Sequence, residues 1–406
     1  MPSSSQHRVD RAGGRHLALR LILLLGVVSA LGDITYESAR SVSGPFFLSL
    51  GASAAVIGFV SGLGEFLGYG LRLLFGVLAD RLRAYWSATV IGYGLLLSLP
   101  LLAFVHSWEA AALLLILERI GKAIRSPSRD TILSYATHHT GRGWGFAIHE
   151  ALDQVGAVIG PLIFAAAFIS GNAYRIGFSL LWIPAILTMV MLVVAWVSVP
   201  RPQELEGTAR AGGPVQGAHG MPRVFWLYAA FTFMSVAGFA SFQIISYHWA
   251  KKELVPTAEV PVLYAVAMGV DALFALAAGK AYDRIGLKVL AAVPVVTAII
   301  PFVAFASSHT LVVLGAVLWG AVMALHETIM RAAIADVTEP DRRATAYGTF
   351  NVVYGAAWFA GSSCLGWLYD LSLAWVGAFV LVVELVALVV FAALERLSLR
   401  VPGRLM

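Results

Sequence analysis

The segment GVLADR at residues 76–81 recurs as GKAYDR at residues 279–284, which lie 203 residues further along the chain. A second pair, RGWGFA at residues 142–147 and RATAYG at residues 343–348, is separated by 201 residues. Because the two separations agree so closely, they indicate a duplicated unit that fills about half of the 406-residue chain. The sequence therefore predicts two related halves.

The composition places both halves in a membrane. Hydrophobic residues make up 59% of the chain and charged residues 13%, with a mean hydropathy of +0.81, whereas about a quarter of the residues in a soluble domain are charged. Apolar runs of about 20 residues must cross a bilayer as helices, because lipid offers the backbone no hydrogen-bond partners. The short alternating segments of a membrane β-barrel do not occur in the sequence. We therefore expect an all-α membrane protein.

The apolar runs between charged or turn-rich breaks predict twelve transmembrane helices in two pseudo-symmetric six-helix bundles. The longest break, residues 200–222, is rich in Gly, Pro and charge, as expected of a linker. We predict an N-terminal bundle over residues 1–199, a cytoplasmic linker over 200–222 and a C-terminal bundle over 223–406. Repeats of this kind hold the substrate between them near mid-membrane. The predicted spans are 21–48, 54–80, 85–105, 108–134, 144–170, 176–199, 223–249, 260–282, 288–306, 310–335, 344–369 and 373–395.

Basic residues outside the spans orient the chain. If the N-terminus is in the cytoplasm, 19 Lys and Arg residues lie on the cytoplasmic side of the membrane. Only Arg175, Lys251 and Lys252 then lie on the opposite side. Orientation follows basic residues near span ends, so both termini are predicted to be cytoplasmic. The N-terminus resembles a signal peptide in its charge order, but no small-residue cleavage site follows, so we expect a retained first span. Minimal loops and short termini indicate a bacterial inner membrane.

Several function classes are disfavoured by the sequence. Cys364 is the only cysteine, which excludes an internal disulfide and a CxxC-type metal site. The formal charge of +5 is explained by cytoplasmic loops, so no nucleic-acid partner is expected. The sequence contains no Walker motif. It also shows no spacing typical of a nucleophile with its base or of a set of metal ligands. We therefore expect no enzyme, no cofactor and no metal, and a transport energy source other than ATP.

The repeated motif carries a family resemblance. Its second copy runs GKAYDRIGLK over residues 279–288: a glycine, three residues, Asp-Arg and a basic loop. With this motif after the second and eighth spans, the chain resembles the major facilitator superfamily over essentially its whole length. The first copy, GVLADRLR at residues 76–83, departs from the family pattern because its loop lacks the usual glycine.

The resemblance implies a gate on the cytoplasmic side. In the family, the aspartate of this motif holds that side shut in one state and releases it in the other. A carboxylate one turn after a glycine can approach a neighbouring helix N-terminus, whose free N–H groups favour negative charge. The alternative is that these charges only set the topology and form turns. The implied gate residues are Gly76, Asp80, Arg81, Gly279, Asp283 and Arg284.

The fifth span contains GAVIGP at residues 156–161. This segment resembles part of a motif of the family's drug-exporting antiporters, in which small residues allow tight packing and proline bends the helix. Phe164 and Ala165 stand where that motif continues with glycine. The resemblance favours export over uptake.

The first span carries the polar stretch GDITYESARS at residues 32–41. Asp33, Glu37 and Arg40 are spaced four and three apart, so they share one helix face. A lone charge at mid-membrane costs about 2.5–3.5 kcal/mol on insertion scales and normally faces the bundle interior. We therefore expect this face to line the central cavity, although Glu37 and Arg40 can also simply neutralise each other. Asp33 has no cation within one turn, and Asp271 has no charged neighbour, so both join Glu37 as proton-coupling residues.

Further polar residues in the spans are predicted to face the same cavity. Glu327 and Arg331, or His149 and Asp153, can instead pair along one helix, and His326 can be a packing residue. Glu150 is expected to reach Arg119 or Arg40, whereas Arg125 and Arg129 are expected at the cytoplasmic boundary. The residues predicted to line the cavity are Tyr36, Arg40, Glu65, Arg119, Lys122, Glu150, His326, Glu327, Arg331, Asn351 and Tyr354.

These features together predict a secondary transporter that works by alternating access. The favoured function is proton-coupled export of a small organic solute or drug by a monomer in the lipid bilayer, with Asp33 or Glu37 as the proton carrier. The sequence leaves open whether the solute is an anion held by Arg119 and Lys122 or a cation held by the carboxylates. The alternatives are proton-coupled uptake and, without transport, a solute sensor or a lipid scramblase.

Overall fold

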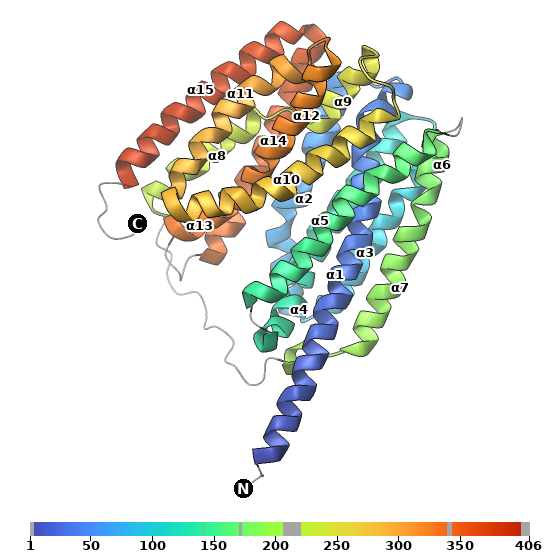
Figure 1. The fold of residues 1–406 in the computed structure, drawn as a ribbon, viewed down its shortest axis with the longest axis vertical. Helices are drawn as coiled ribbons and strands as arrows, with labels where there is room; N and C mark the ends of the chain where they lie inside the picture. The colour runs from blue at the N-terminus through green and yellow to red at the C-terminus, as the bar shows by residue number, and fades with distance from the viewer. Residues whose placement is uncertain (1–3, 141, 170–172, 206–220, 339–342, 399–406) are drawn as a thin grey trace.

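The computed structural model describes residues 4–140, 142–169, 173–205, 221–338 and 343–398 (Figure 1). Over these residues the chain is almost entirely helical and contains no strand. The elements are α1 (Ser4–Ser49), α2 (Ala54–Leu82), α3 (Tyr85–Gly94), η1 (Leu95–Ser98), η2 (Pro100–Phe104), α4 (Trp108–Thr140), α5 (Arg142–Ala167), α6 (Ala173–Leu180), α7 (Trp182–Ser198), η3 (Pro202–Leu205), α8 (Arg223–Ala237), α9 (Phe242–Lys251), α10 (Glu259–Ile285), η4 (Gly286–Ala291), α11 (Ala292–Ala304), α12 (His309–Ala324), the π-helical turn η5 (Leu325–Ile329), α13 (Met330–Val337), α14 (Arg343–Leu371) and α15 (Leu373–Ser398).

Within the described residues these elements form the twelve predicted passages. Nine helical stretches are long and apolar enough to cross a membrane, and one of them, Glu259–Ala304, contains two passages, α10 and α11. The other two passages are α4, which carries charges along its middle, and α14, which is rich in Gly, Ser, Trp and Tyr. α1 begins at Ser4, well before the predicted span that starts at residue 21. An apolar run indicates where a helix enters the lipid, whereas the helix itself can begin earlier in the chain.

The passages form two bundles. Figure 1 shows helices α1 to α7 gathered on one side, here called the N-terminal bundle, and α8 to α15 on the other, here called the C-terminal bundle. They meet most extensively through α2 and α14, then through α5 with α10 and α1 with α9, and over smaller areas through α1 with α10 and α2 with α9. Small residues allow this close approach, since a Cβ added to Gly58 would meet the backbone of Ser362, and one added to Gly366 would meet the backbone of Ala54. The predicted linker, 200–222, includes residues 206–220, which lie outside the described chain.

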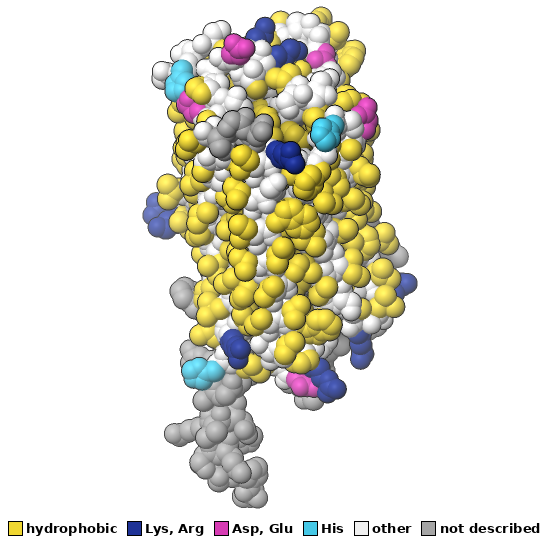
Figure 2. All heavy atoms as spheres, turned by 90° about the vertical axis from the view of Figure 1, so that its right-hand side faces the viewer, with side chains coloured by type: hydrophobic (Ala, Val, Ile, Leu, Met, Phe, Trp, Pro, Cys, Tyr) yellow, Lys and Arg dark blue, Asp and Glu magenta, His cyan; other side chains and the backbone are white. Residues whose placement is uncertain are grey.

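The molecule has two ends, which we name by the path of the chain. At the distal end α1 stops at Ser49 and α2 begins at Ala54, and at the proximal end α2 stops at Leu82 and α3 begins at Tyr85. On the face drawn in Figure 2, hydrophobic side chains cover the middle of the molecule, and most Lys, Arg, Asp and Glu side chains lie toward its two ends. This distribution is the one expected of a protein that spans a bilayer.

The helix boundaries reproduce the sequence repeat. α2 ends at Leu82 and α10 at Ile285, 203 residues later, while α5 begins at Arg142 and α14 at Arg343, 201 residues later. The residue that follows each of these two helices, α2 and α10, has a positive φ, 49° at Arg83 and 60° at Gly286, although ψ differs, 33° and −143°. A positive φ is costly for a residue with a Cβ but is freely accessible to glycine.

This difference at the end of α2 gives a stability prediction. Arg83→Gly is expected to raise the free energy of unfolding by about 1 kcal/mol, because glycine adopts the left-handed conformation (φ 49°, ψ 33°) without steric cost. Thermal melting in detergent measures the change. Arg83→Ala is the control, because it removes the same charge but keeps a Cβ, and equal melting of the two variants would contradict the prediction.

Candidate functional site

A polar cavity lies between the two bundles. α1, α2, α4 and α5 form its N-terminal wall, while the C-terminal wall consists of Met268 and Asp271 from α10, Met323 from α12 and Glu327 from η5. Toward the proximal end the cavity extends to Asp130, whose side chain is nearly half exposed, and to Glu150, which is exposed. The three predicted proton-coupling residues, Asp33, Glu37 and Asp271, all line it.

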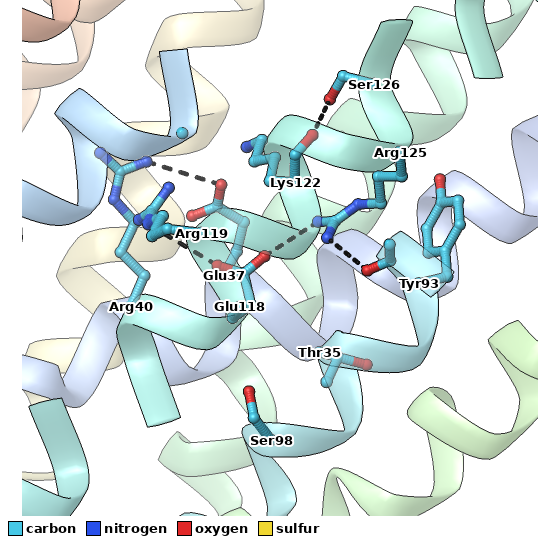
Figure 3. A network of polar contacts seen from close by, with 12 residues as sticks. Thr35, Glu37, Arg40, Tyr93, Ser98, Glu118, Arg119, Lys122, Arg125 and Ser126 are labelled. Carbon is cyan, nitrogen blue, oxygen red and sulfur yellow. Dashed lines mark hydrogen bonds and ion pairs between the residues drawn. The ribbon is translucent and has the colours of Figure 1, made fainter. Parts of the chain in front are cut away.

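A chain of alternating buried charges crosses the N-terminal bundle beside this cavity (Figure 3). The Arg40 guanidinium lies 3.8 Å from Glu37 and 3.5 Å from Glu65. Arg119 lies 3.2 Å from Glu65 and 3.7 Å from Glu118. This row of charges joins α1, α2 and α4, and both Arg40 and Arg119 have an acidic partner.

Arg125 extends the same chain of charges along α4. Its guanidinium lies 3.0 Å from Glu118 and also donates to the Gly92 carbonyl at 3.4 Å. Arg129 follows one turn later and pairs with Asp130 at 2.9 Å. Arg125 and Arg129, which were expected at the cytoplasmic boundary, lie within α4, which continues to Thr140, and their side chains are largely enclosed by the bundle.

The ring of Tyr36 is a platform for several cations. The Lys122 ammonium lies 4.2 Å from the ring centroid, and the guanidinium carbons of Arg119 and Arg40 lie at 4.4 and 5.8 Å. Such contacts stabilise a cation through the negative face of the ring. Tyr36, Arg40 and Arg119 also line an apolar chamber on the distal side, together with Ser43, Phe47 and other residues.

One hydrogen bond in the site joins the two bundles. The Tyr264 hydroxyl of α10 donates to Glu37 Oε2 of α1 at 2.5 Å, and both side chains are buried. Hydrogen bonds to an ionised acceptor are roughly twice as strong as neutral ones. The charge state of Glu37 therefore influences contact between the bundles. Nothing in the sequence around Tyr264 distinguishes it from other aromatic residues in the spans, so sequence reasoning missed it.

Three carboxylates in the cavity lack a partner. Among the described residues, Asp33, Asp271 and Glu327 make no hydrogen bond or ion pair. Lys122 also has no acidic partner within ion-pair distance and contacts the Tyr36 ring instead. The described part of the C-terminal wall contributes carboxylates and methionines but no basic side chain. The described part of this wall therefore offers carboxyl groups and no cation to whatever enters.

The other sequence-predicted residues fall into two groups. The first group lines the polar cavity, the apolar chamber or a smaller third pocket that shares residues with both: Tyr36, Arg40, Glu65, Arg119, Lys122, Glu150 and Glu327. Glu150 does not pair with Arg119 or Arg40, because its side chain is exposed and both arginines contact Glu65 instead.

The second group lies away from these cavities. His326 is enclosed in the C-terminal bundle edge-on to Phe239, and Tyr354 packs against Tyr69 of the N-terminal bundle. Asn351 is half-buried on α14 and lines none of the three cavities. The side chain of Arg331 lies outside the described part of the chain, so its expected pairing with Glu327 is not described.

Two local predictions about α5 and α1 agree with the contacts. His149 Nδ1 lies 3.6 Å from Asp153 Oδ2, and its Nε2 lies 2.9 Å from Ser29 Oγ. The GAVIGP segment packs on α1, since a Cβ added to Gly156 would meet the Ala30 carbonyl, and Ser38 Oγ donates to the Gly160 carbonyl at 2.5 Å.

The gate residues implied by the repeat lie at the proximal ends of α2 and α10. Asp80, Arg81, Asp283 and Arg284 are exposed, and Asp80 accepts a hydrogen bond from Tyr85 of its own bundle at 2.9 Å. Gly76 packs beside Pro127 of α4, whereas nothing lies within 4 Å of a Cβ added to Gly279. No described contact of these side chains bridges the bundles.

Comparisons with known proteins agree with this architecture. The model of the Major Facilitator Superfamily matches residues 22–286 and 244–404. An uncharacterised protein of Mycobacterium tuberculosis is 42% identical over 402 residues, which cover 97% of this chain and 98% of the relative. The multidrug resistance protein MdtH of Photorhabdus laumondii is 34% identical over 122 residues, 29% of either chain.

A solved structure shares the fold. It is a bacterial homologue of the human lysosomal transporter Spinster in an inward-facing and occupied conformation, with a TM-score of 0.74 and 15% identity, and the match covers 95% of this chain and 98% of that one. The twelve passages, the cavity between two bundles and the family match over both halves lead to one conclusion: the chain belongs to the Major Facilitator Superfamily and is a multi-pass membrane transporter.

Proposed function

We propose that this transporter exports an organic cation in exchange for protons. The observation that carries the proposal is the imbalance of pairing in the cavity. Among the described residues, three carboxylates of the cavity, Asp33, Asp271 and Glu327, have no basic partner, against one ammonium, that of Lys122, without an acidic partner. Arg40 and Arg119 are neutralised by buried acids. A positive group is therefore the complement of this cavity, and the anionic solute that the sequence left open is disfavoured.

The same carboxylates supply a means of coupling. An ionised carboxylate attracts a cation, and protonation removes that attraction, so a proton and a cationic solute compete for one group. Asp33 lies on the N-terminal wall, and Asp271 lies on the C-terminal wall, so the competition involves both bundles. Glu37 transmits the charge state to the C-terminal bundle through its hydrogen bond with Tyr264.

The proposed direction of transport depends on the orientation of the chain in the membrane and on its similarity to known proteins. The excess of basic residues on the proximal side supports cytoplasmic termini, so the cavity would face the cytoplasm of a bacterial cell. The partial match to a multidrug resistance protein and the GAVIGP segment of α5 both favour export. We further propose that the unit of transport is a monomer.

Inverted membrane vesicles with an acidic interior test this function. Tetraphenylphosphonium is the cationic probe, and tetraphenylborate, with the same shape and opposite charge, is its control. Export by proton exchange predicts accumulation of the phosphonium inside the vesicles and release of protons. Depletion of the phosphonium from the interior would indicate symport, hence uptake. Binding without exchange would indicate a sensor, lipid transfer alone a scramblase, and preference for the borate would contradict the proposed charge.

Asp33→Asn is expected to abolish transport driven by a pH gradient while solute exchange without a gradient stays measurable. The reason is that asparagine keeps the shape of the side chain but carries no exchangeable proton. Uptake of the probe into vesicles with and without the gradient measures both activities. Glu109→Gln, which neutralises an exposed acid at the start of α4, is the control. Unchanged gradient-driven uptake in Asp33→Asn would remove Asp33 from the proton path.

A further inference from the structure

At the distal end, Asp370 forms a contact between the two bundles. The gate residues implied by the repeat lie at the opposite end and take no part in it. Asp370, near the end of α14 in the C-terminal bundle, accepts hydrogen bonds from the first two residues of α2 in the N-terminal bundle. The Ala54 N–H donates to Oδ1 at 3.3 Å, and the Ala55 N–H donates to Oδ2 at 2.9 Å. A carboxylate of one bundle therefore caps a helix of the other.

Helix physics explains why this contact is favourable. The first N–H groups of a helix lack partners inside the helix, and its N-terminus carries partial positive charge. Ser53, the N-cap residue of α2, accepts only from the Val56 N–H, at 3.3 Å. Asp370 satisfies the two donors that precede Val56. An ionised acceptor at this place is both a hydrogen-bond partner and a counter-charge.

Asp370 is held in place by its own bundle. The preceding residue, Tyr369, places its hydroxyl 2.7 Å from His248 Nδ1 of α9. The Lys251 ammonium, also on α9, lies 5.4 Å from the Tyr369 ring. The end of α14 is thus tied to α9, so the contact with α2 transmits any movement between the bundles.

We propose that Asp370 is the distal gate residue of this transporter, and that its cap on α2 holds the distal side shut in the conformation described here. Several contacts place the closed side at this end. Gly44 of α1 packs against the Gln243 carbonyl and Ser246 of α9, and Gly366 of α14 packs against Ala54 of α2. At the proximal end the cavity extends to the exposed Glu150.

Alternating access requires this contact to break. When the distal side opens, the start of α2 must leave the end of α14, and water replaces the carboxylate at the freed N–H groups. Ser53 remains, because it belongs to α2 itself. The Asp370 cap therefore stabilises one state and not the other, which is the condition for a group to bias a conformational equilibrium.

A labelling experiment tests the gate without any solute. Ser43→Cys in a Cys364→Ser background places one thiol in the apolar chamber behind the closed end. A membrane-impermeant maleimide is added to intact cells and, separately, to inverted vesicles. Asp370→Ala is expected to speed labelling about fivefold from the distal face only, because losing a helix cap costs about 1 kcal/mol and this energy corresponds to about that factor.

Two further variants make the result decisive. Glu259→Gln is the matched control, because Glu259 lies at the same end and contacts His309, at 2.6 Å, within its own bundle. Asp370→Asn keeps a neutral acceptor, so its labelling rate should fall between wild type and Asp370→Ala, and it serves as the test if the alanine variant does not accumulate. Equal labelling of the Asp370 variants and Glu259→Gln would overturn the proposal, whatever the transported solute is.

Discussion

Glu37→Gln is expected to lose both gradient-driven transport and exchange without a gradient. Glutamine has no ionisable group, so it cannot carry a proton or offset Arg40, which lies 3.8 Å from Glu37. It also replaces the charged acceptor of Tyr264 with a neutral amide. Hydrogen bonds to charged groups contribute about 1.5–3 kcal/mol, so the conformational equilibrium is expected to shift roughly 10- to 100-fold. Flux of the cationic probe in both assays measures the effect.

Tyr264→Phe separates the two roles of Glu37. The variant removes the hydroxyl that reaches across the bundles and leaves the carboxylate and its pairing with Arg40 intact. Its transport should slow but keep its dependence on the pH gradient, whereas Glu37→Gln should lose that dependence. If Glu37→Gln responds to the gradient as the wild type does, Glu37 is not part of the coupling.

Arg125→Met is expected to destabilise the folded protein by about 3–5 kcal/mol, the cost of leaving one member of a buried ion pair alone. Glu118 is 1% exposed, and its carboxylate lies 3.0 Å from Arg125. Its other basic neighbour, Arg119, is farther away at 3.7 Å and shares its charge with Glu65. Thermal unfolding in detergent, followed by tryptophan fluorescence, measures the loss.

The double variant Glu118→Gln with Arg125→Met tests the electrostatic origin of this cost. Removing the second charge eliminates the unpaired group, so the double variant should recover much of the stability that Arg125→Met loses. Recovery would identify the uncompensated Glu118 charge as the cause. Equal stability of the double and single variants would instead assign the loss to the packing of the Arg125 side chain.

Sequence patterns sufficed for the architecture because each depends on local chemistry. Hydropathy located the passages, and a repeat of 201–203 residues divided them into halves whose helix ends reproduce the same separations. Arg119 and Lys122 of α4 were assigned to the cavity because hydrocarbon excludes charged side chains. The four- and three-residue spacing of Asp33, Glu37 and Arg40 assigned them to one helix face, and all three line the polar cavity.

Tertiary structure alone decided which groups face each other across helices. Spacing assigned Glu37 to a helix face but could not identify Tyr264, 227 residues away, as its partner. It likewise gave no sign that Asp370 caps a helix that begins 316 residues earlier. Helical periodicity fixes the direction of a side chain relative to its own axis, whereas the group it meets depends on how distant helices pack. The sequence by itself therefore determined the spans, the halves and the charged faces, and the packing of the bundles decided the network and the gate.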